Sequence, residues 1–219
     1  LHTRKIYDNF LKQGMNFELS IEFYKHLIYT CHKNKKKVGL SVCDMKTFKT
    51  YKNLNFDFYK LMSLSINNFE LINELKKKNK PIYISTGFKS KLSNIKKCIK
   101  AFKNKKKLIL LHTPMTYKIS ELNFPNIDYL RKKFKLDVGY SNHSNDINSL
   151  NVLSAYNPKV VFLYCKPQRS KTKVYPDDGH ALYLDELEKV KKNYIDYLKA
   201  NTFNKKLIKV NIFQNEVKK

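Results

Sequence analysis

The sequence predicts an α/β protein made of repeated strand–helix units around a parallel sheet. Short apolar runs alternate with helix-like segments at intervals of roughly 20 to 28 residues, which is the rhythm of parallel βα folds. The runs are almost continuously apolar, as expected for strands that are buried on both faces. Polar residues and glycines gather where the runs end. Substrates bind at the carboxyl ends of the strands in such folds, so these positions are candidates for a site.

Six apolar runs are predicted to be strands. A closed (β/α)₈ barrel needs eight, so six leave two interpretations open: an open, doubly wound sheet, or a barrel from which two units are missing. The second interpretation predicts a curved sheet whose opening lies beside the first and last strands. The predicted strands are Val38–Cys43, Phe58–Ser63, Pro81–Ser85, Leu108–His112, Asp137–Tyr140 and Val160–Tyr164.

The segments between these runs carry apolar residues every three or four positions, which predicts helices packed on the sheet. Ser20 is the predicted N-cap of the first helix, and Ser90 of the fourth. Asp185 is predicted to open the last helix, with Glu188 completing a capping box. Other helices are predicted over Lys46–Leu54, along Phe69, Ile72 and Leu75, and near Asn126–Lys133 and Asp146–Tyr156.

Length and composition indicate a globular protein with a real core. The chain has 219 residues, 42% of them hydrophobic, which suits one domain or part of a larger one. It begins at Leu1 without a signal-peptide pattern and has no apolar run near 18 residues, so we expect a cytoplasmic protein. The four cysteines are widely spaced, which predicts reduced, mostly buried thiols: Cys31, Cys43, Cys98 and Cys165.

The formal net charge of +26 suggests nucleic acid or an anionic membrane as a partner, but the distribution of the charge argues against both. Only three residues are arginines, the side chain best suited to bidentate phosphate and base contacts. Many lysines lie in short runs at the ends of helix-like segments, where they are solvated and complement the helix dipole. We therefore expect neither a nucleic-acid nor a membrane partner.

Polar side chains follow five of the predicted strands. Several hydroxyls and a lysine around one mouth would suit a phosphate- or carboxylate-bearing substrate, because each oxygen needs a donor and the charge needs a counter-ion. His112 is expected to pack and hydrogen-bond at this mouth, while His2, His26 and His32 are predicted to lie on the surface. The polar positions are Lys60 and Ser63, Ser85 and Thr86, His112, Thr113 and Tyr117, Ser141 and His143, and Asp177, Asp178 and His180.

These segments resemble the sialic acid synthase family, which comprises phosphoenolpyruvate-dependent N-acetylneuraminate synthases and their pseudaminic and legionaminic acid relatives. The resemblance runs from about Leu19 to Leu198. It is most specific in the Ser-Thr-Gly and Gly-x-Ser-x-His sequences. The matching segments are Tyr59–Ser63, Lys80–Gly87, Leu110–Thr113, Val138–His143, and Pro176–His180 with Leu184–Leu187.

The resemblance implies a TIM-type (β/α)₈ barrel, here partial with six βα units, that is usually followed by an antifreeze-like domain. It implies addition of C3 of phosphoenolpyruvate to the open-chain aldehyde of an N-acetylhexosamine, with release of phosphate and with Mn²⁺ or Mg²⁺ as Lewis acid. The implied partners are phosphoenolpyruvate and an N-acetylated sugar, and a homodimer is an open alternative to a monomer.

The resemblance also implies roles for individual residues. Lys60, Ser63, Ser85 and Ser141 match positions that hold the phosphate and carboxylate of phosphoenolpyruvate. His143 matches one of two metal-binding histidines and is a predicted catalytic residue. Tyr117 and Asp177 match contacts to the acylated sugar and complete the predicted catalytic set; for Asp177 the register of the loop can slip by one residue.

The chain departs from the family pattern at several of these positions. Tyr164 stands where the second metal-binding histidine is expected, Ser65 replaces a sugar-side glutamate, Met115 precedes Tyr117, and Asn142 replaces an aspartate. The first two strands and the antifreeze-like domain find no counterpart, so residues 1–219 are interpreted as a partial barrel domain with its core over 19–198. The sequence thus predicts a synthase-like protein of surface polysaccharide biosynthesis that is inactive as given. The alternative is a non-catalytic relative that binds a sugar or phosphosugar.

Overall fold

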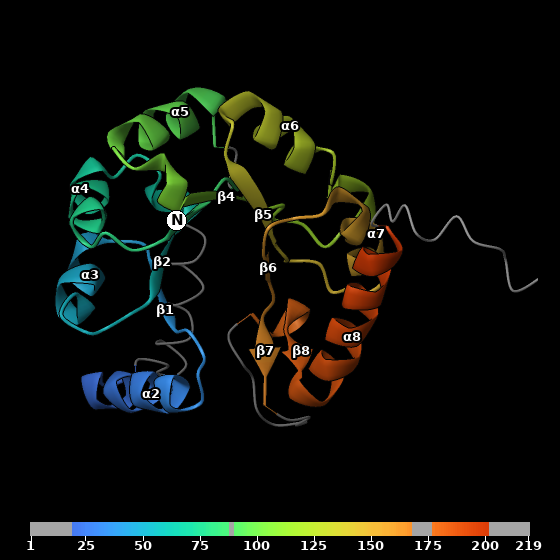
Figure 1. Ribbon diagram of the computed structural model, residues 1–219, viewed down its shortest axis with the longest axis horizontal. Coiled ribbons are helices and arrows are strands. Elements are labelled where there is room, and N and C mark those ends of the chain that lie inside the picture. Colours follow the sequence, from blue (N-terminus) through green and yellow to red (C-terminus); the bar gives the residue numbers. More distant parts are fainter. Residues whose placement is uncertain (1–18, 88–89, 168–176, 202–219) are drawn as a thin grey trace, which may run out of the picture.

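The computed structural model describes residues 19–87, 90–167 and 177–201. Six parallel strands form one curled sheet in the order β1-β2-β3-β4-β5-β6, so that the order in space follows the order in the chain (Figure 1). This confirms the partial barrel and is inconsistent with a doubly wound sheet, in which the strand order reverses in the middle. The strands are β1 (Gly39–Val42), β2 (Phe58–Leu61), β3 (Ile82–Ser85), β4 (Leu108–His112), β5 (Asp137–Ser141) and β6 (Val161–Phe162).

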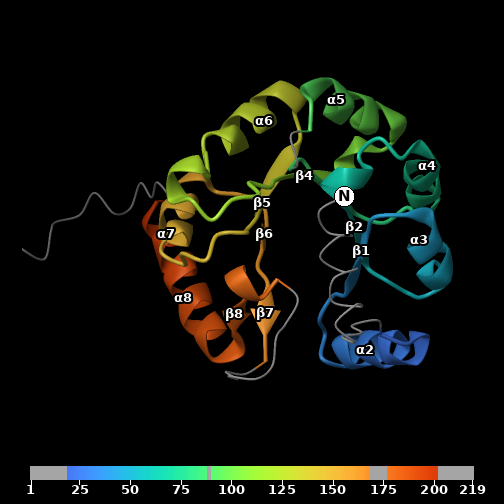
Figure 2. The ribbon, with the colours of Figure 1, turned by 180° about the vertical axis from the view of Figure 1, so that it is seen from behind.

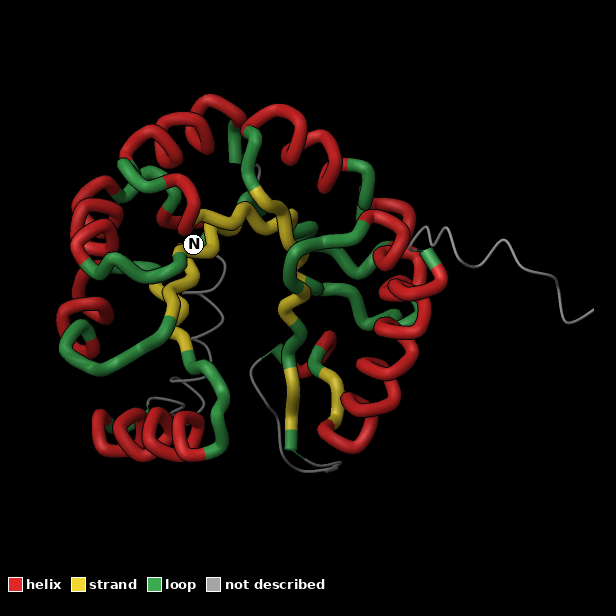
Figure 3. Tube along the Cα trace, in the orientation of Figure 1, coloured by secondary structure: helices red, strands yellow, loops and turns green. Residues whose placement is uncertain are grey.

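The helices form an outer arc around the inner arc of strands, as the coloured trace in Figure 3 and the view from behind in Figure 2 both show. Within the part of the chain that is described, no helix is long and apolar enough to cross a membrane. The helices are α2 (Ile21–Lys33), α3 (Met45–Tyr51), α4 (Phe69–Lys77), α5 (Leu92–Ala101), α6 (Asn126–Phe134), α7 (Ser149–Leu153) and α8 (Leu184–Ala200).

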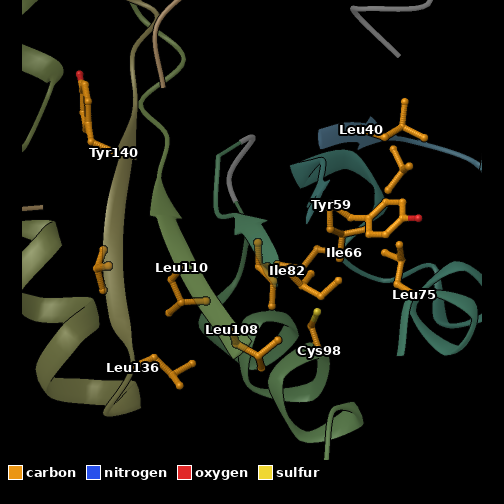
Figure 4. Packing of buried hydrophobic residues seen from close by; sticks show 14 of the residues in the cluster. Leu40, Tyr59, Ile66, Leu75, Ile82, Cys98, Leu108, Leu110, Leu136 and Tyr140 are labelled. Carbon is orange, nitrogen blue, oxygen red and sulfur yellow. The ribbon is translucent and has the colours of Figure 1, made fainter. Parts of the chain in front are cut away.

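Alternate residues of each strand point outward and build the core between sheet and helices, because successive side chains of a strand face opposite sides. Leu110 and Val138 are completely buried in this layer. Figure 4 shows strand residues such as Tyr59 and Ile82 in the same cluster as Leu75 of α4 and Cys98 of α5. The residues between them face the inside of the arc.

The last predicted strand is divided in the structure. Val160–Tyr164 was expected to be continuous, but pairing with β5 ends at Phe162. The chain then forms β7 (Cys165–Lys166), which pairs in parallel with β8 (Leu182–Tyr183) in a separate small sheet. Two-residue strands carry no periodic signal, so the sequence could not reveal this second sheet.

Three predicted helix starts are wrong, and each for a local reason. Ser90 donates its hydroxyl to the carbonyl of Gly87 at 2.6 Å, so Lys91 and not Ser90 is the N-cap of α5. Asp146 accepts from the N–H of Asn148 at 2.9 Å in a turn, and α7 begins only at Ser149. The α8 helix starts at Leu184, and its capping-box carboxylate is Glu186, which accepts from the Tyr183 N–H at 3.1 Å. The predicted Ser20 cap of α2 is confirmed.

The cysteine prediction is correct in one respect and wrong in another. All four cysteines are free, but only Cys98 is buried, whereas Cys43 and Cys165 are exposed. The exposed pair lies at strand ends, where the chain leaves the core. His26 and His32 are exposed as predicted, and His2 lies outside the described residues.

Candidate active site

A cleft of about 380 Å³ opens at the carboxyl ends of the strands, on the inner side of the sheet. Most of the residues that the sequence singled out line it: Lys60, Ser63, Ser85, Tyr117, His143 and Asp177. Ser141 lies beside it, because its hydroxyl accepts a hydrogen bond from Lys60. The structure therefore brings all seven predicted site residues together. Thr113, Tyr164 and His180 complete much of the lining.

The inner face of the sheet has two layers beneath this mouth. The lower layer is aromatic: the ring of Tyr83 lies 5.2 Å from those of Phe58 and Phe162, in edge-to-face geometry. The upper layer is polar. It holds Lys60, two residues after Phe58 in β2, and Ser85, two residues after Tyr83 in β3. The period of two along a strand thus places one functional group directly above one aromatic ring.

Lys60 is the buried cation of the site. Only 6% of it is exposed, and its Nζ donates to Ser141 Oγ at 3.0 Å. The ammonium also lies 5.0 Å from the centre of the Phe162 ring. Burial lowers the pKa of Lys60 to about 8, against the raising effect of the Asp177 charge. An ammonium with one hydrogen-bond acceptor among the described residues has spare donors, which an anion in the cleft can use.

The serines of the mouth are held differently. Ser85 is buried and lies 3.3 Å from the hydroxyl of Thr113, and Ser63 begins a short 3₁₀ helix after β2. Ser65 belongs to the same 3₁₀ helix, but its hydroxyl donates to the carbonyl of Cys43 and does not line the cleft. At the position where the family carries a sugar-side glutamate, this chain therefore has a structural hydroxyl.

His143 is held as one defined tautomer. Its Nδ1 lies 3.2 Å from the carbonyl of Ser141, and because a carbonyl can only accept, Nδ1 carries the proton. The lone pair of Nε2 then accepts from the Tyr164 hydroxyl, also at 3.2 Å. Burial, together with the nearby charges of His180 and Lys60, lowers the pKa of His143 to about 4. Burial raises the pKa of Tyr164 to about 12, so the pair is neutral at pH 7.

His180 is the site residue whose importance could not be predicted from the sequence. It was noted as a polar residue of the last loop and given no role. Its side chain is 6% exposed, yet neither ring nitrogen has a hydrogen-bond partner among the described residues. The ring lies 5.1 Å from that of His143 and 4.6 Å from that of Tyr164. A buried imidazole without a partner is costly, and a bound ligand is one way to satisfy it.

Two predicted sugar contacts lie at the exposed rim. Tyr117 is 56% exposed, and its ring centroid is 6.0 Å from that of His180. Asp177 has a left-handed backbone (φ 59°), and its carboxylate is 3.9 Å from His180 Nε2, which is too far for a hydrogen bond. His112 packs at the mouth as predicted, with its Nε2 2.8 Å from the carbonyl of Leu122.

Comparison with known proteins identifies the family. The model of the NeuB family matches residues 2–200, which is most of the chain. The chain belongs to the NeuB family. Its match to the N,N'-diacetyllegionaminic acid synthase of Campylobacter jejuni is 28% identical over 144 residues, covering 63% of this chain and 43% of that protein. The chain thus corresponds to less than half of this curated relative.

Solved structures agree with the fold that this family membership implies. The chain resembles an N-acetylneuraminic acid synthetase from Leptospira borgpetersenii, solved in complex with citrate, with a TM-score of 0.77 and 21% identity over 92% of this chain and 70% of that one. A truncated 3-deoxy-D-arabino-heptulosonate 7-phosphate synthase from Thermotoga maritima gives a TM-score of 0.71 at 15% identity, covering 90% and 80% of the two chains. At these identities the likeness supports the α/β barrel-type fold alone.

The metal that the NeuB resemblance implies does not fit the described side chains. Nowhere in residues 19–87, 90–167 and 177–201 do three His, Cys, Asp or Glu side chains gather as a metal-binding group. The Nε2 lone pair of His143 already accepts from Tyr164, and a neutral phenol is a weak ligand for Mn²⁺ or Mg²⁺. The donor set is therefore that of a hydrogen-bonding site.

Proposed function

We propose that this chain forms the phosphoenolpyruvate-binding part of a nonulosonic acid synthase. In the reaction that this assigns, C3 of phosphoenolpyruvate forms a bond to the aldehyde carbon of an N-acetylhexosamine-type aldose. Water adds at C2, and the phosphate leaves, so that one nonulosonic acid and one phosphate are formed. The product class is that of surface polysaccharide precursors, and the proposed location is the cytoplasm.

The observation that carries the proposal is the pairing of Lys60 with Ser141 in the mouth of the curled sheet. The buried ammonium, together with hydroxyl groups such as those of Ser63, Ser85 and Thr113 in the lining, provides one positive charge and several donors within a single cleft. Ionised oxygens of a phosphate or carboxylate make hydrogen bonds that are roughly twice as strong as neutral ones, so this arrangement favours an anion over a neutral sugar. Lys60, Ser63, Ser85 and Ser141 are the proposed anion contacts.

The exposed side of the cleft is the proposed place for the aldose. Tyr117 and Asp177 lie at the rim, where a polyhydroxylated ligand can keep part of its hydration, and the buried His143 lines the same cleft. These roles extend the family resemblance. They require that the acceptor sugar and the anion occupy the cleft together.

A second candidate function is that of a non-catalytic binder of a sugar or phosphosugar. It is favoured by Ser65, whose hydroxyl is bonded to the Cys43 carbonyl and supplies no carboxylate to the cleft. A carboxylate in general acid–base catalysis contributes about 10² to 10⁴ in rate, which a serine cannot replace. Both candidates predict anion binding at Lys60 and differ in turnover.

Isothermal titration with phosphoenolpyruvate tests the proposal. Lys60→Met should weaken binding by about 10- to 100-fold, because a hydrogen bond to a charged group contributes about 1.5 to 3 kcal/mol. Lys46→Met, at an exposed position of α3, is the matched control and should leave the affinity unchanged. Equal affinity of the Lys60→Met variant and the unaltered chain would refute the anion site.

A further inference from the structure

The position of Tyr164 bears on how the anion's charge is neutralised. The family resemblance puts a metal-binding histidine at this position, and the structure puts the tyrosine hydroxyl 3.2 Å from His143 Nε2. That nitrogen is the only one of the His143 ring with a free lone pair, because Nδ1 donates to the Ser141 carbonyl. Nε2 is the one atom of His143 that could bind a metal, and it already accepts a hydrogen bond from Tyr164. Tyr164 itself stands where the second metal-binding histidine is expected.

The charge that a cation would supply is present in another form. Lys60 Nζ lies 5.9 Å from the centre of the Tyr164 ring, and both residues line the cleft. Charges of like sign repel more strongly in a partly buried site than in water, because the effective dielectric constant is lower there. A divalent cation between His143 and Tyr164 would therefore have to displace a hydrogen bond and also approach a buried ammonium.

We propose that this site binds its anionic ligand without a divalent cation, because Tyr164 stands at the position of a second metal ligand and supplies only a neutral hydroxyl, which is bonded to His143. Lys60 neutralises the anion, and the Tyr164–His143 pair completes the wall of the cleft as a neutral hydrogen-bonded unit. The inference rests on the anion-binding function proposed above. It goes beyond that function because it assigns the difference between this chain and metal-dependent synthases to one side chain, that of Tyr164.

Two measurements test the proposal, and the first contains no anionic ligand. The electron paramagnetic resonance signal of free Mn²⁺ is followed as the protein is added. The unaltered chain should leave the signal unchanged, whereas Tyr164→His should bind Mn²⁺ at least tenfold more tightly. Tyr164→Phe is the matched control, since it frees the His143 lone pair without adding a ligand, and it should remain without Mn²⁺. Adding His143→Gln to Tyr164→His should abolish the gained binding.

The second measurement is the affinity for phosphoenolpyruvate with EDTA and with added Mn²⁺. The unaltered chain should bind equally under both conditions. A tenfold gain with Mn²⁺ would overturn the proposal, as would Mn²⁺ binding to the unaltered chain that is lost in His143→Gln or His180→Gln. A Tyr164→His variant that keeps native circular dichroism and gains no Mn²⁺ would also overturn it. If phosphoenolpyruvate fails to bind at all, the proposed function fails, and the Mn²⁺ measurement still decides this inference.

Discussion

Lys60 shows how one residue can be unfavourable for folding and useful for binding. Its ammonium is removed from water, and among the described residues its hydrogen-bond acceptor is Ser141 Oγ, with the charge of Asp177 as partial compensation. Burying a charge with so little compensation is unfavourable. An incoming anion supplies the missing partner, so part of the binding free energy comes from relieving this cost.

The affinity for phosphoenolpyruvate should fall as the pH rises through the Lys60 pKa of about 8. Only the ammonium form attracts the anion, so the dissociation constant should increase about tenfold between pH 7 and pH 9. The charge of phosphoenolpyruvate does not change in this range, because phosphate esters lose their second proton at about pH 6. Titrations across this range give the measurement. Lys60→Arg, which stays protonated, should bind with little pH dependence, and a flat profile for the unaltered chain would contradict the assignment.

Replacing Lys60 by methionine should stabilise the folded chain at pH 7. A folded-state pKa of about 8 against the usual 10.5 corresponds to an upper limit of about 3 kcal/mol. The sign follows from proton binding: between these two values the unfolded chain binds more protons, so the unaltered chain gains stability as the pH rises. The advantage of Lys60→Met should therefore shrink from pH 7 to pH 10. Urea denaturation of both proteins measures it, and a destabilised variant at pH 7 would show that the ammonium is well compensated.

At the scale of elements, the short strand β6 is held to the site by its aromatic residue. It contributes two residues to the sheet, and Phe162 contacts Tyr83 and Phe58 from the inner side. The same ring lies beneath the Lys60 ammonium. The aromatic layer thus joins the last strand of the sheet to the second and third, and supports the polar layer above it.

Phe162→Ala should therefore weaken both stability and binding. Loss of two edge-to-face contacts at about 0.5 to 1.5 kcal/mol each predicts a free energy of unfolding lower by about 1 to 3 kcal/mol. The affinity for phosphoenolpyruvate should fall as well, because Lys60 loses the ring beneath it. Phe162→Leu keeps most of the side-chain volume, so it should lose less stability and less affinity than Phe162→Ala. Denaturation and calorimetry provide the readouts, and unchanged binding in a destabilised Phe162→Ala protein would separate the aromatic layer from the site.

At the scale of the whole molecule, the curl of the sheet creates the site. Lys60 belongs to β2 and Ser141 to β5, which are three strand spacings apart, or about 14 Å in a flat sheet. Their side chains nevertheless meet at 3.0 Å. The same reasoning applies to Phe58 and Phe162, whose rings lie 6.4 Å apart although their strands are four positions apart. Only a strongly curled sheet brings these pairs together.

The chain as given should bind phosphoenolpyruvate and show no measurable turnover. Synthesis needs aldehyde polarisation, charge neutralisation and proton transfer, and Lys60 with the serines serves only the second. Each missing catalytic group costs about 10² to 10⁴ in rate, and the losses multiply. The assay is phosphate release from phosphoenolpyruvate and N-acetylmannosamine, run beside the binding titration. Robust turnover that is lost in His143→Gln would show that Tyr164 and Ser65 are tolerated replacements.

The sequence alone determined the features that depend on local pattern. Continuous apolar runs gave the six strands of the main sheet, the Ser20 cap gave the start of α2, and the motifs at the strand ends gave the seven residues that meet at the cleft. These predictions succeeded because strand burial and helix capping involve neighbouring residues. The helix starts at Ser90, Asp146 and Asp185 failed because side chains bonded to nearby backbone groups instead.

Only the tertiary structure decided how the site residues are used. The Tyr164 hydroxyl bonds to His143, and the Ser65 hydroxyl bonds to the Cys43 carbonyl, each across more than 20 residues of chain. The lack of hydrogen-bond partners for the His180 ring among the described residues follows from its burial. The curl of the sheet was predicted through the family resemblance and not through the apolar pattern, since six βα units suit an open sheet as well as an incomplete barrel. In the curled sheet, helices pack on the outer face and aromatic rings meet on the inner face, and these contacts join residues far apart in the chain.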